Sequence, residues 1–208
     1  MVAVTRPFRQ QVDGGIVDRA ASLFARYGFE QTSLQAVADA VGLSKAGLLQ
    51  HFPSKEALRE AAMAQAQTLG RQAVEGVRDL PPGPERDRQA IEVLVDIALA
   101  HPGLVALLLA PAMDLSATAA VDPQAAETTD AALAAFGVDP GTTDPARLVR
   151  VVGALAALAV LTLAAHQKDA TTAWRRHIVA TCTDALGRPP APAPSAVAAL
   201  SDLDQVEA

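Results

Sequence analysis

The sequence predicts an all-α protein of about nine helices, arranged as a small three-helix head followed by a larger helical domain. Half of the 208 residues are hydrophobic but only 3% are aromatic. Apolar residues recur three and four positions apart rather than in the alternation of a strand. We assign the head to residues 10–70 and the second domain to 71–187. The proline- and alanine-rich tail, 188–208, is expected to be disordered at least through residue 195.

Two short helices and a tight turn are predicted in residues 33–52, SLQAVADAVGLSKAGLLQHF. Thr32 or Ser33 can cap the first helix, and Gly42 can end it, because a residue without a Cβ adopts the left-handed conformation most easily. Ser44 can cap the second helix. The apolar positions of the first helix fall on one face: Leu34, Val37, Ala38 and Val41. This spacing is typical of a helix-turn-helix motif.

The second helix of the motif runs from Lys45 towards Phe52, and Leu48 and Phe52 face inward together at positions i and i+4. Its outward-facing residues are Lys45, Ala46, Leu49 and Gln50. In this motif the second helix is held across the first by the turn, and its outer face enters the major groove of DNA. The pattern therefore predicts sequence-specific binding of double-stranded DNA.

Together with its flanks, the segment 16–58 resembles the TetR family of dimeric transcriptional repressors, and the resemblance covers the first third of the chain. It implies a three-helix head, a first helix that ends at Gly28 and a fourth helix opened by residues 53–56. It also implies dimerisation through the last two long helices. The resemblance places five residues of the first helix in its buried stripe: Ile16, Ala20, Leu23, Phe24 and Tyr27.

We expect the motif and its edges to contact DNA through Thr32, Ser33, Ser44, Lys45, Ala46, Leu49, Gln50, His51 and Lys55. Many members of the family carry a tyrosine in the position of Leu49, and its hydroxyl commonly reaches a DNA phosphate. Leu49 cannot do so. It either touches a thymine methyl group or packs on the first helix. For His51, the family match suggests a role near phosphate or in packing.

The net charge of −6 is divided unevenly along the chain. Residues 1–60 contain seven Lys and Arg against six Asp and Glu, whereas the remainder contains ten against seventeen. A head of nearly balanced charge still binds phosphates if its basic residues cluster. Those near the expected contact surface are Arg6, Arg9, Lys45 and Lys55.

After the motif, six further helices are expected: 54–79, 85–100, 104–114, one from 117 or 123 to 136, 145–166 and 170–186. The proline-rich residues 80–84 end the first of these. Pro111 is expected to kink or end the third, which is nearly all apolar and must therefore lie inside the domain. The longest apolar run, 151–165, is shorter than the ~20 residues that span a bilayer, so we expect a buried helix and no membrane contact.

Helix 145–166 has two apolar faces, and the one rich in small residues allows a partner helix to approach closely. The expected homodimer interface is Val152, Ala156, Val160, Leu163, Ile178 and Cys182. A small apolar or amphipathic effector is expected in a pocket lined by Met63, Gln67, His101, Leu108, Met113 and Trp174. The alternative is that these residues fill a dry core. Because helix 54–79 reaches both sites, a ligand that tilts it would respace the two heads and weaken DNA binding.

Composition also excludes several classes of function. The one cysteine, Cys182, rules out an intrachain disulfide and zinc fingers and favours a reducing cytoplasm. Its spacing from Trp174 and Ile178 predicts a buried, inert thiol. The four histidines lack metal-site spacing, and no phosphate loop or nucleophile elbow is present, so we expect no metal, no cofactor and no enzymatic activity. Residues 1–15 lack the apolar core of a signal peptide.

We interpret the chain as a cytoplasmic homodimeric regulator that binds a palindromic DNA operator and represses transcription until a small-molecule effector releases it. Three other interpretations stay open at this point: a helical regulator that acts by protein–protein contact, a constitutive DNA binder without a ligand, and a small helical enzyme. The first predicts no salt-dependent duplex binding, the second an affinity for DNA that no ligand changes, and the third a measurable turnover.

Overall fold

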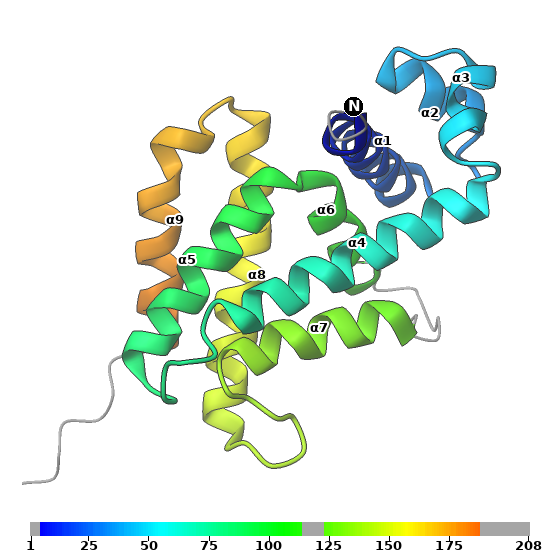
Figure 1. Cartoon of the computed structure of the whole chain (residues 1–208). Helices are drawn as coiled ribbons and strands as arrows, with labels where there is room; N and C mark the ends of the chain where they lie inside the picture. The colour runs from blue at the N-terminus through cyan, green and yellow to red at the C-terminus, as the bar shows by residue number, and fades with distance from the viewer. Residues whose placement is uncertain (1–4, 114–122, 188–208) are drawn as a thin grey trace, which may run out of the picture.

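The computed structural model describes the backbone of residues 5–113 and 123–187 and the side chains of 11–110 and 126–187 (Figure 1). All regular structure in these ranges is helical, as predicted. The helices are α1 (Thr5–Tyr27), α2 (Leu34–Val41), α3 (Lys45–His51), α4 (Lys55–Glu75), α5 (Pro84–Ala100), α6 (Pro102–Met113), α7 (Pro123–Ala135), α8 (Pro145–Gln167) and α9 (Thr171–Leu186). The predicted tail, 188–208, lies outside the described residues.

The helices form a head and a body. The head consists of α1, α2, α3 and the beginning of α4, and the body consists of α5 to α9 with the rest of α4 (Figure 1). α4 runs from the head into the body and packs along α7 there. The predicted domain boundary at residue 70 therefore falls inside one continuous helix.

Local signals in the sequence locate most helix ends. Ser33 caps α2, because its Oγ accepts the N–H of Ala36 at 3.1 Å, and Gly42 ends the helix at a φ of 73°. Ser44 caps α3 in the same way. One expected end was wrong, because α4 ends at Glu75 rather than near 79. Pro111 does not end α6, which continues to Met113. The alternative start of α7 at residue 117 lies outside the described residues.

The head core confirms most of the buried stripe that the resemblance implied. Ile16, Ala20 and Phe24 are buried, and Leu23 is partly buried against the same core. Tyr27 is the exception, with 52% of its surface exposed. It is the last residue of α1, and its ring faces the Arg26 guanidinium at 5.2 Å instead of entering the core.

The body core lies among α5, α8 and α9. α8 packs against α9, and α5 packs against both. Arg175 of α9 donates two hydrogen bonds to the carboxylate of Asp96 on α5, at 2.6 and 2.7 Å. Ile178 and Cys182 point into this core and are buried. Their prediction as interface residues was therefore wrong, because α9 turns this face towards its own protomer.

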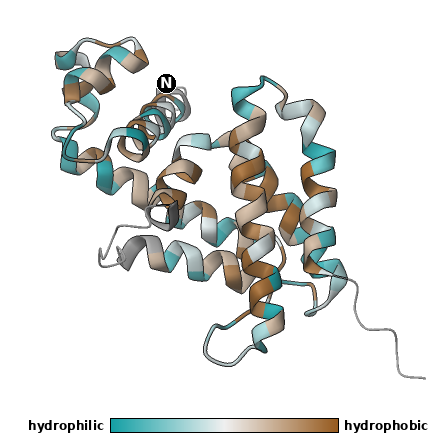
Figure 2. Cartoon of the chain, turned by 180° about the vertical axis from the view of Figure 1, so that it is seen from behind, coloured by the Kyte–Doolittle hydropathy of each residue, from teal (hydrophilic) through white to brown (hydrophobic). Residues whose placement is uncertain are grey.

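α8 is only partly buried, although the apolar run 151–165 predicted a buried helix. Val149, Val152 and Val160 are 69%, 48% and 50% exposed. Figure 2 shows apolar residues along α8 on the side turned away from the viewer in Figure 1. At 23 residues, α8 is long and apolar enough to cross a membrane by length and composition, with 28% of its most apolar window buried. A core or interface helix of a water-soluble protein has the same composition.

The head and the body meet where α6 begins. A Cβ on Gly103 would overlap the backbone carbonyl of Asp18 on α1, so only glycine allows this approach. The Asp18 carboxylate accepts the N–H of Leu104 at 3.0 Å and so caps the start of α6. Leu104 itself is buried in the head core. Val17 and Ala21, which the buried stripe of α1 did not include, are buried because α1 packs against α6 as well as α4.

We expect Gly103→Ala to destabilise the protein by about 1–3 kcal/mol, because the new methyl group can be accommodated only by separating α6 from α1. Urea unfolding measures the change. Gly15→Ala is the matched control, since a Cβ at that helical position meets open space and adds helix propensity. Equal stability of the two variants would contradict the close contact.

We expect the thiol of Cys182 to resist alkylation in the native protein. Burial raises its pKa to about 11, and the thiolate is the reactive form. Native labelling by iodoacetamide at pH 8 should be at least roughly a hundredfold slower than labelling in urea, since two pKa units reduce the thiolate fraction by that factor. Comparable rates in both conditions would show that the thiol is accessible.

Candidate functional site

The outer face of α3 is available to a partner. Lys45, Ala46 and Gln50 are exposed, and so is Leu49 at 39%. On the opposite face Leu48 is fully buried in the head core, so the helix cannot roll without exposing it. Leu49 is therefore exposed rather than buried against α1, and its contact with a thymine methyl group stays a prediction.

Two polar contacts hold α3 and the start of α4 against the rest of the head. His51, at the end of α3, places its Nδ1 2.6 Å from the carboxylate of Asp13 on α1. Lys55 donates from Nζ to the carbonyl of Phe29 at 2.8 Å, and its ammonium lies 4.3 Å from the Phe29 ring centroid. Both side chains therefore position the motif.

Several predicted DNA-binding residues consequently have internal partners. Thr32 is buried, and its hydroxyl donates to the carbonyl of Gly28 at 2.8 Å at the end of α1, so its side chain cannot reach DNA and that prediction was wrong. Ser33 and Ser44 are exposed but their hydroxyls cap α2 and α3. Lys45, Ala46, Leu49 and Gln50 are exposed and stay predicted DNA contacts. The side chains of Arg6 and Arg9 lie outside the described residues.

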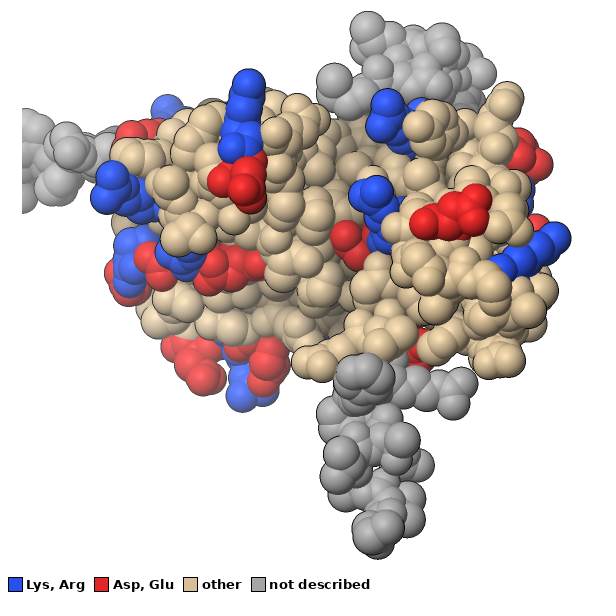
Figure 3. Space-filling model, turned by 90° about the horizontal axis from the view of Figure 1, so that it is seen from above, with Lys and Arg blue, Asp and Glu red and all other residues tan. Residues whose placement is uncertain are grey.

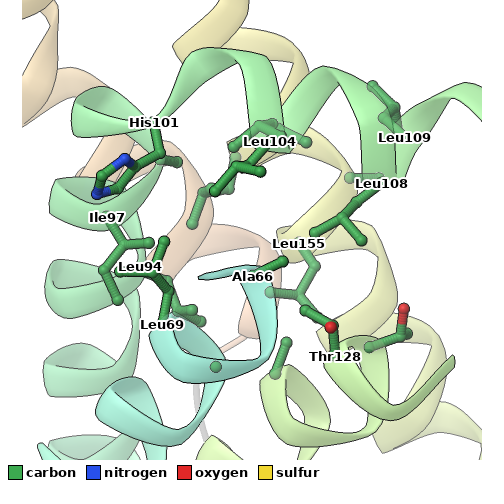
Figure 4. A pocket seen from close by; sticks show the side chains of 18 of the residues that line it. Ala66, Leu69, Leu94, Ile97, His101, Leu104, Leu108, Leu109, Thr128 and Leu155 are labelled. Atoms are coloured by element: carbon green, nitrogen blue, oxygen red, sulfur yellow. The ribbon is translucent and has the colours of Figure 1, made fainter. Parts of the chain in front are cut away.

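A second feature is a cavity of about 300 Å³ in the body, between α4, α5, α6, α7 and α8. Its walls are almost entirely aliphatic, and the polar side chains among the lining residues are those of His101, Thr128 and Thr129. Figure 4 shows Leu69 and Ala66 of α4, Leu94 and Ile97 of α5 and Leu155 of α8 around it. A cavity of this size and apolarity suits a small hydrophobic ligand.

Two of the predicted ligand residues, His101 and Leu108, line this cavity. Met63 lies on the same face of α4 but one turn nearer the head, and it is buried there. Gln67 points to α7, where it donates to Glu127 at 2.9 Å. Trp174 is on α9, which contributes no lining residue, and the side chain of Met113 lies outside the described residues. The ligand residues were predicted from their residue types. The observed lining consists mostly of aliphatic residues from five helices, and such residues do not by themselves indicate a cavity in the sequence.

Within the described residues, no three His, Cys, Asp or Glu side chains gather closely enough to hold a metal ion. The cavity and the outer face of α3 are therefore the two candidate functional sites in the described part of the chain.

Comparison with known proteins identifies the head. Residues 16–62 match the model of a family described as bacterial regulatory proteins, tetR family. A 50-residue segment is 44% identical to the HTH-type transcriptional regulator RutR of Escherichia coli K12 and of Shigella flexneri. The match spans 24% of this chain and 24% of RutR, which is about a quarter of the length of these curated relatives.

The fold over most of the chain is similar to that of PfmR from Thermus thermophilus, a TetR family transcriptional regulator. The TM-score is 0.54 with 22% sequence identity, over 85% of this chain and 96% of PfmR. The predicted all-helical architecture, with a helix-turn-helix head and a helical body, is thus confirmed. The family that residues 16–62 match is one of regulatory proteins rather than enzymes.

We expect Gln50→Ala to cost about 1–3 kcal/mol of binding free energy on the preferred DNA site and to relax its sequence preference, because an exposed glutamine can pair with adenine in the major groove. Lys45→Ala should instead weaken binding to all sequences similarly and flatten its dependence on salt. Fluorescence anisotropy with specific and scrambled duplexes at several salt concentrations measures both. If both variants keep the parent's affinity and salt slope, α3 is not the reading helix.

Proposed function

We propose that this chain, whose residues 16–62 match the tetR family of bacterial regulatory proteins, is a homodimeric transcriptional repressor whose affinity for a palindromic operator is lowered by a small apolar or amphipathic effector. The observation that carries the proposal is the position of α6. This helix forms one wall of the apolar cavity and begins in direct contact with the head. One element therefore adjoins both of the sites that the proposal connects.

Dimerisation is supported by the exposed apolar face of α8. Val152, Ala156 and Val160 follow one another by four residues along this helix and all three are exposed. Leu163, the remaining α8 residue of the predicted interface, is partly buried. A row of this kind is the ordinary surface of a homodimer in an aqueous compartment, so a partner α8 can cover it. We propose a cytoplasmic location for this dimer.

Two helices that line the cavity also reach the head, and they can therefore couple effector binding to DNA binding. α4 contributes Ala66, Leu69 and Gly70 to its lining and continues into the head at Lys55. α6 contributes Leu104, which is also part of the head core. A ligand that displaces either helix rotates the head and changes the spacing of the two α3 helices. Since operator half-sites lie about one helical turn (~34 Å) apart, a small change of spacing loses one set of groove contacts.

We expect the affinity for operator and the affinity for effector to oppose each other by the same factor, typically about 5–150-fold. The operator is first obtained by sequencing genomic fragments that the purified protein retains. Apolar metabolites and drugs are then screened for thermal stabilisation, and each hit is titrated with and without operator. A hit that binds equally well in both titrations would contradict the coupling, and absence of salt-dependent duplex binding would contradict the regulator itself.

We expect Val160→Glu to convert the dimer into soluble monomers. The residue is half exposed in the protomer, so a carboxylate there leaves the fold intact but would be buried without a partner in the dimer, at a cost of several kcal/mol. Sedimentation velocity measures the mass, and circular dichroism checks the fold. Ala64→Glu, at an exposed position of α4, is the control that should stay dimeric. An unchanged dimer in the Val160 variant would place the interface elsewhere.

A further inference from the structure

α6 lies between two cavities and contributes lining residues to both. His101, Leu104, Val105 and Leu108 face the apolar cavity described above. Pro102, Gly103, Ala106 and Ala110 line a second, larger groove of about 790 Å³ between the head and the body. Leu109 lines both, and it is the one residue that the two described linings share. The apolar cavity and the groove thus adjoin at a single leucine side chain.

The chemistry of the groove differs from that of the apolar cavity. Its far walls are α1, with Asp18, Arg19, Ser22 and Arg26, and the end of α8, with Leu163, His166 and Gln167. Figure 3 shows Lys, Arg, Asp and Glu side chains beside the hollow between head and body. The groove therefore combines two guanidinium groups, one imidazole and one carboxylate.

The carboxylate already has a hydrogen-bond partner, whereas the two guanidinium groups have no polar partner within the described residues. Asp18 accepts the N–H of Leu104 at 3.0 Å. Arg19 has no hydrogen-bond or ion-pair partner among the described residues, and Arg26 contacts only the face of the Tyr27 ring there. His166 uses Nδ1 to donate to the carbonyl of Thr162 at 2.9 Å, which leaves its Nε2 free. Unpaired guanidinium groups in a groove favour an anion.

We propose that the effector is an amphipathic anion that occupies both cavities, with its aliphatic part in the apolar cavity and its carboxylate or phosphate against Arg19 and Arg26. This inference rests on the proposed function, in which the apolar cavity takes the effector. It adds that the ligand passes Leu109 and contacts the head directly. A ligand of this kind contacts α1 on one side of α6 and the body on the other. It therefore bridges the contact between α1 and α6, which orients the head.

The size of the apolar cavity sets the length of the aliphatic part. At about 30 Å³ for each methylene-sized group, close to the share of one water molecule in the liquid, 300 Å³ holds about ten such groups. No Asp, Glu, Lys or Arg side chain lines this cavity, so a charged group inside it would lack a compensating partner. A chain of about ten carbons fills the apolar cavity, and a single terminal anionic group lies in the groove beside Arg19 and Arg26.

The test is isothermal titration calorimetry of the full-length protein with four probes. Decanoate and decyl phosphate carry the tail and an anion, decanol carries the tail alone, and acetate carries the anion alone. We expect one site per protomer for both amphipathic anions, with at least about tenfold weaker binding of decanol and none of acetate. The two anionic probes decide whether the headgroup is a carboxylate or a phosphate.

Variants identify the groove as the headgroup site. Arg19→Ala and Arg26→Ala should each weaken binding of the preferred anion about tenfold while leaving the affinity for decanol unchanged. The control is Arg71→Ala, which removes an exposed arginine of α4 outside both cavities and should leave every probe unaffected. A merely structural effect of the Arg19 or Arg26 change would weaken decanol equally.

The proposal is overturned if decanol binds as tightly as decanoate and decyl phosphate, or if neither groove arginine affects the anionic probes. It is also overturned if acetate binds in the presence of saturating decanoate, because the two cavities would then be independent sites. Operator binding is measured on the same preparations. Loss of the ligand pattern with operator binding intact rejects the amphipathic anion alone, whereas a protein that binds no operator rejects the proposed function.

Discussion

The arrangement of the molecule depends on the contact between Gly103 and the backbone of Asp18. A glycine at the start of α6 lets that helix approach α1 more closely than any side chain allows, and the Asp18 carboxylate fixes the approach by capping α6. Because this contact places Leu104 in the head core, α6 belongs to the head at one end and to the cavity wall along the rest of its length. The orientation of α3 relative to the body follows from it.

The polar residues around the helix-turn-helix motif illustrate a second constraint. A helix of seven residues such as α3 has too few contacts to be rigid alone. His51 and Lys55 connect its end and the following helix to α1 and to the Phe29 backbone. These side chains look like phosphate ligands in the sequence because they are basic and adjoin the motif. In the folded head they determine where the free side chains of Lys45 and Gln50 point.

The sequence predicted the parts of the structure that are specified locally. Ser33, Gly42 and Ser44 define α2, the turn and α3 through contacts within three or four residues, and these elements were correct. The contact between Gly103 and Asp18 joins residues far apart in the chain, and Gly103 after a proline indicates a helix break just as well. The cavity was not predicted either, because its lining also comes from distant segments. In addition, aliphatic residues such as Leu94 and Leu155 look identical in the sequence whether they fill a core or line a space.

The division of the cavity wall between two cores has an evolutionary consequence. Leu94 and Leu155 pack with the body cluster, whereas Leu104 packs with the head cluster, yet all three line the same space. Substitutions at the first two positions can alter the shape available to a ligand while the head stays as it is. Under the proposed function, descendants of such a protein could therefore acquire new effectors one side chain at a time after gene duplication and still recognise the ancestral promoter.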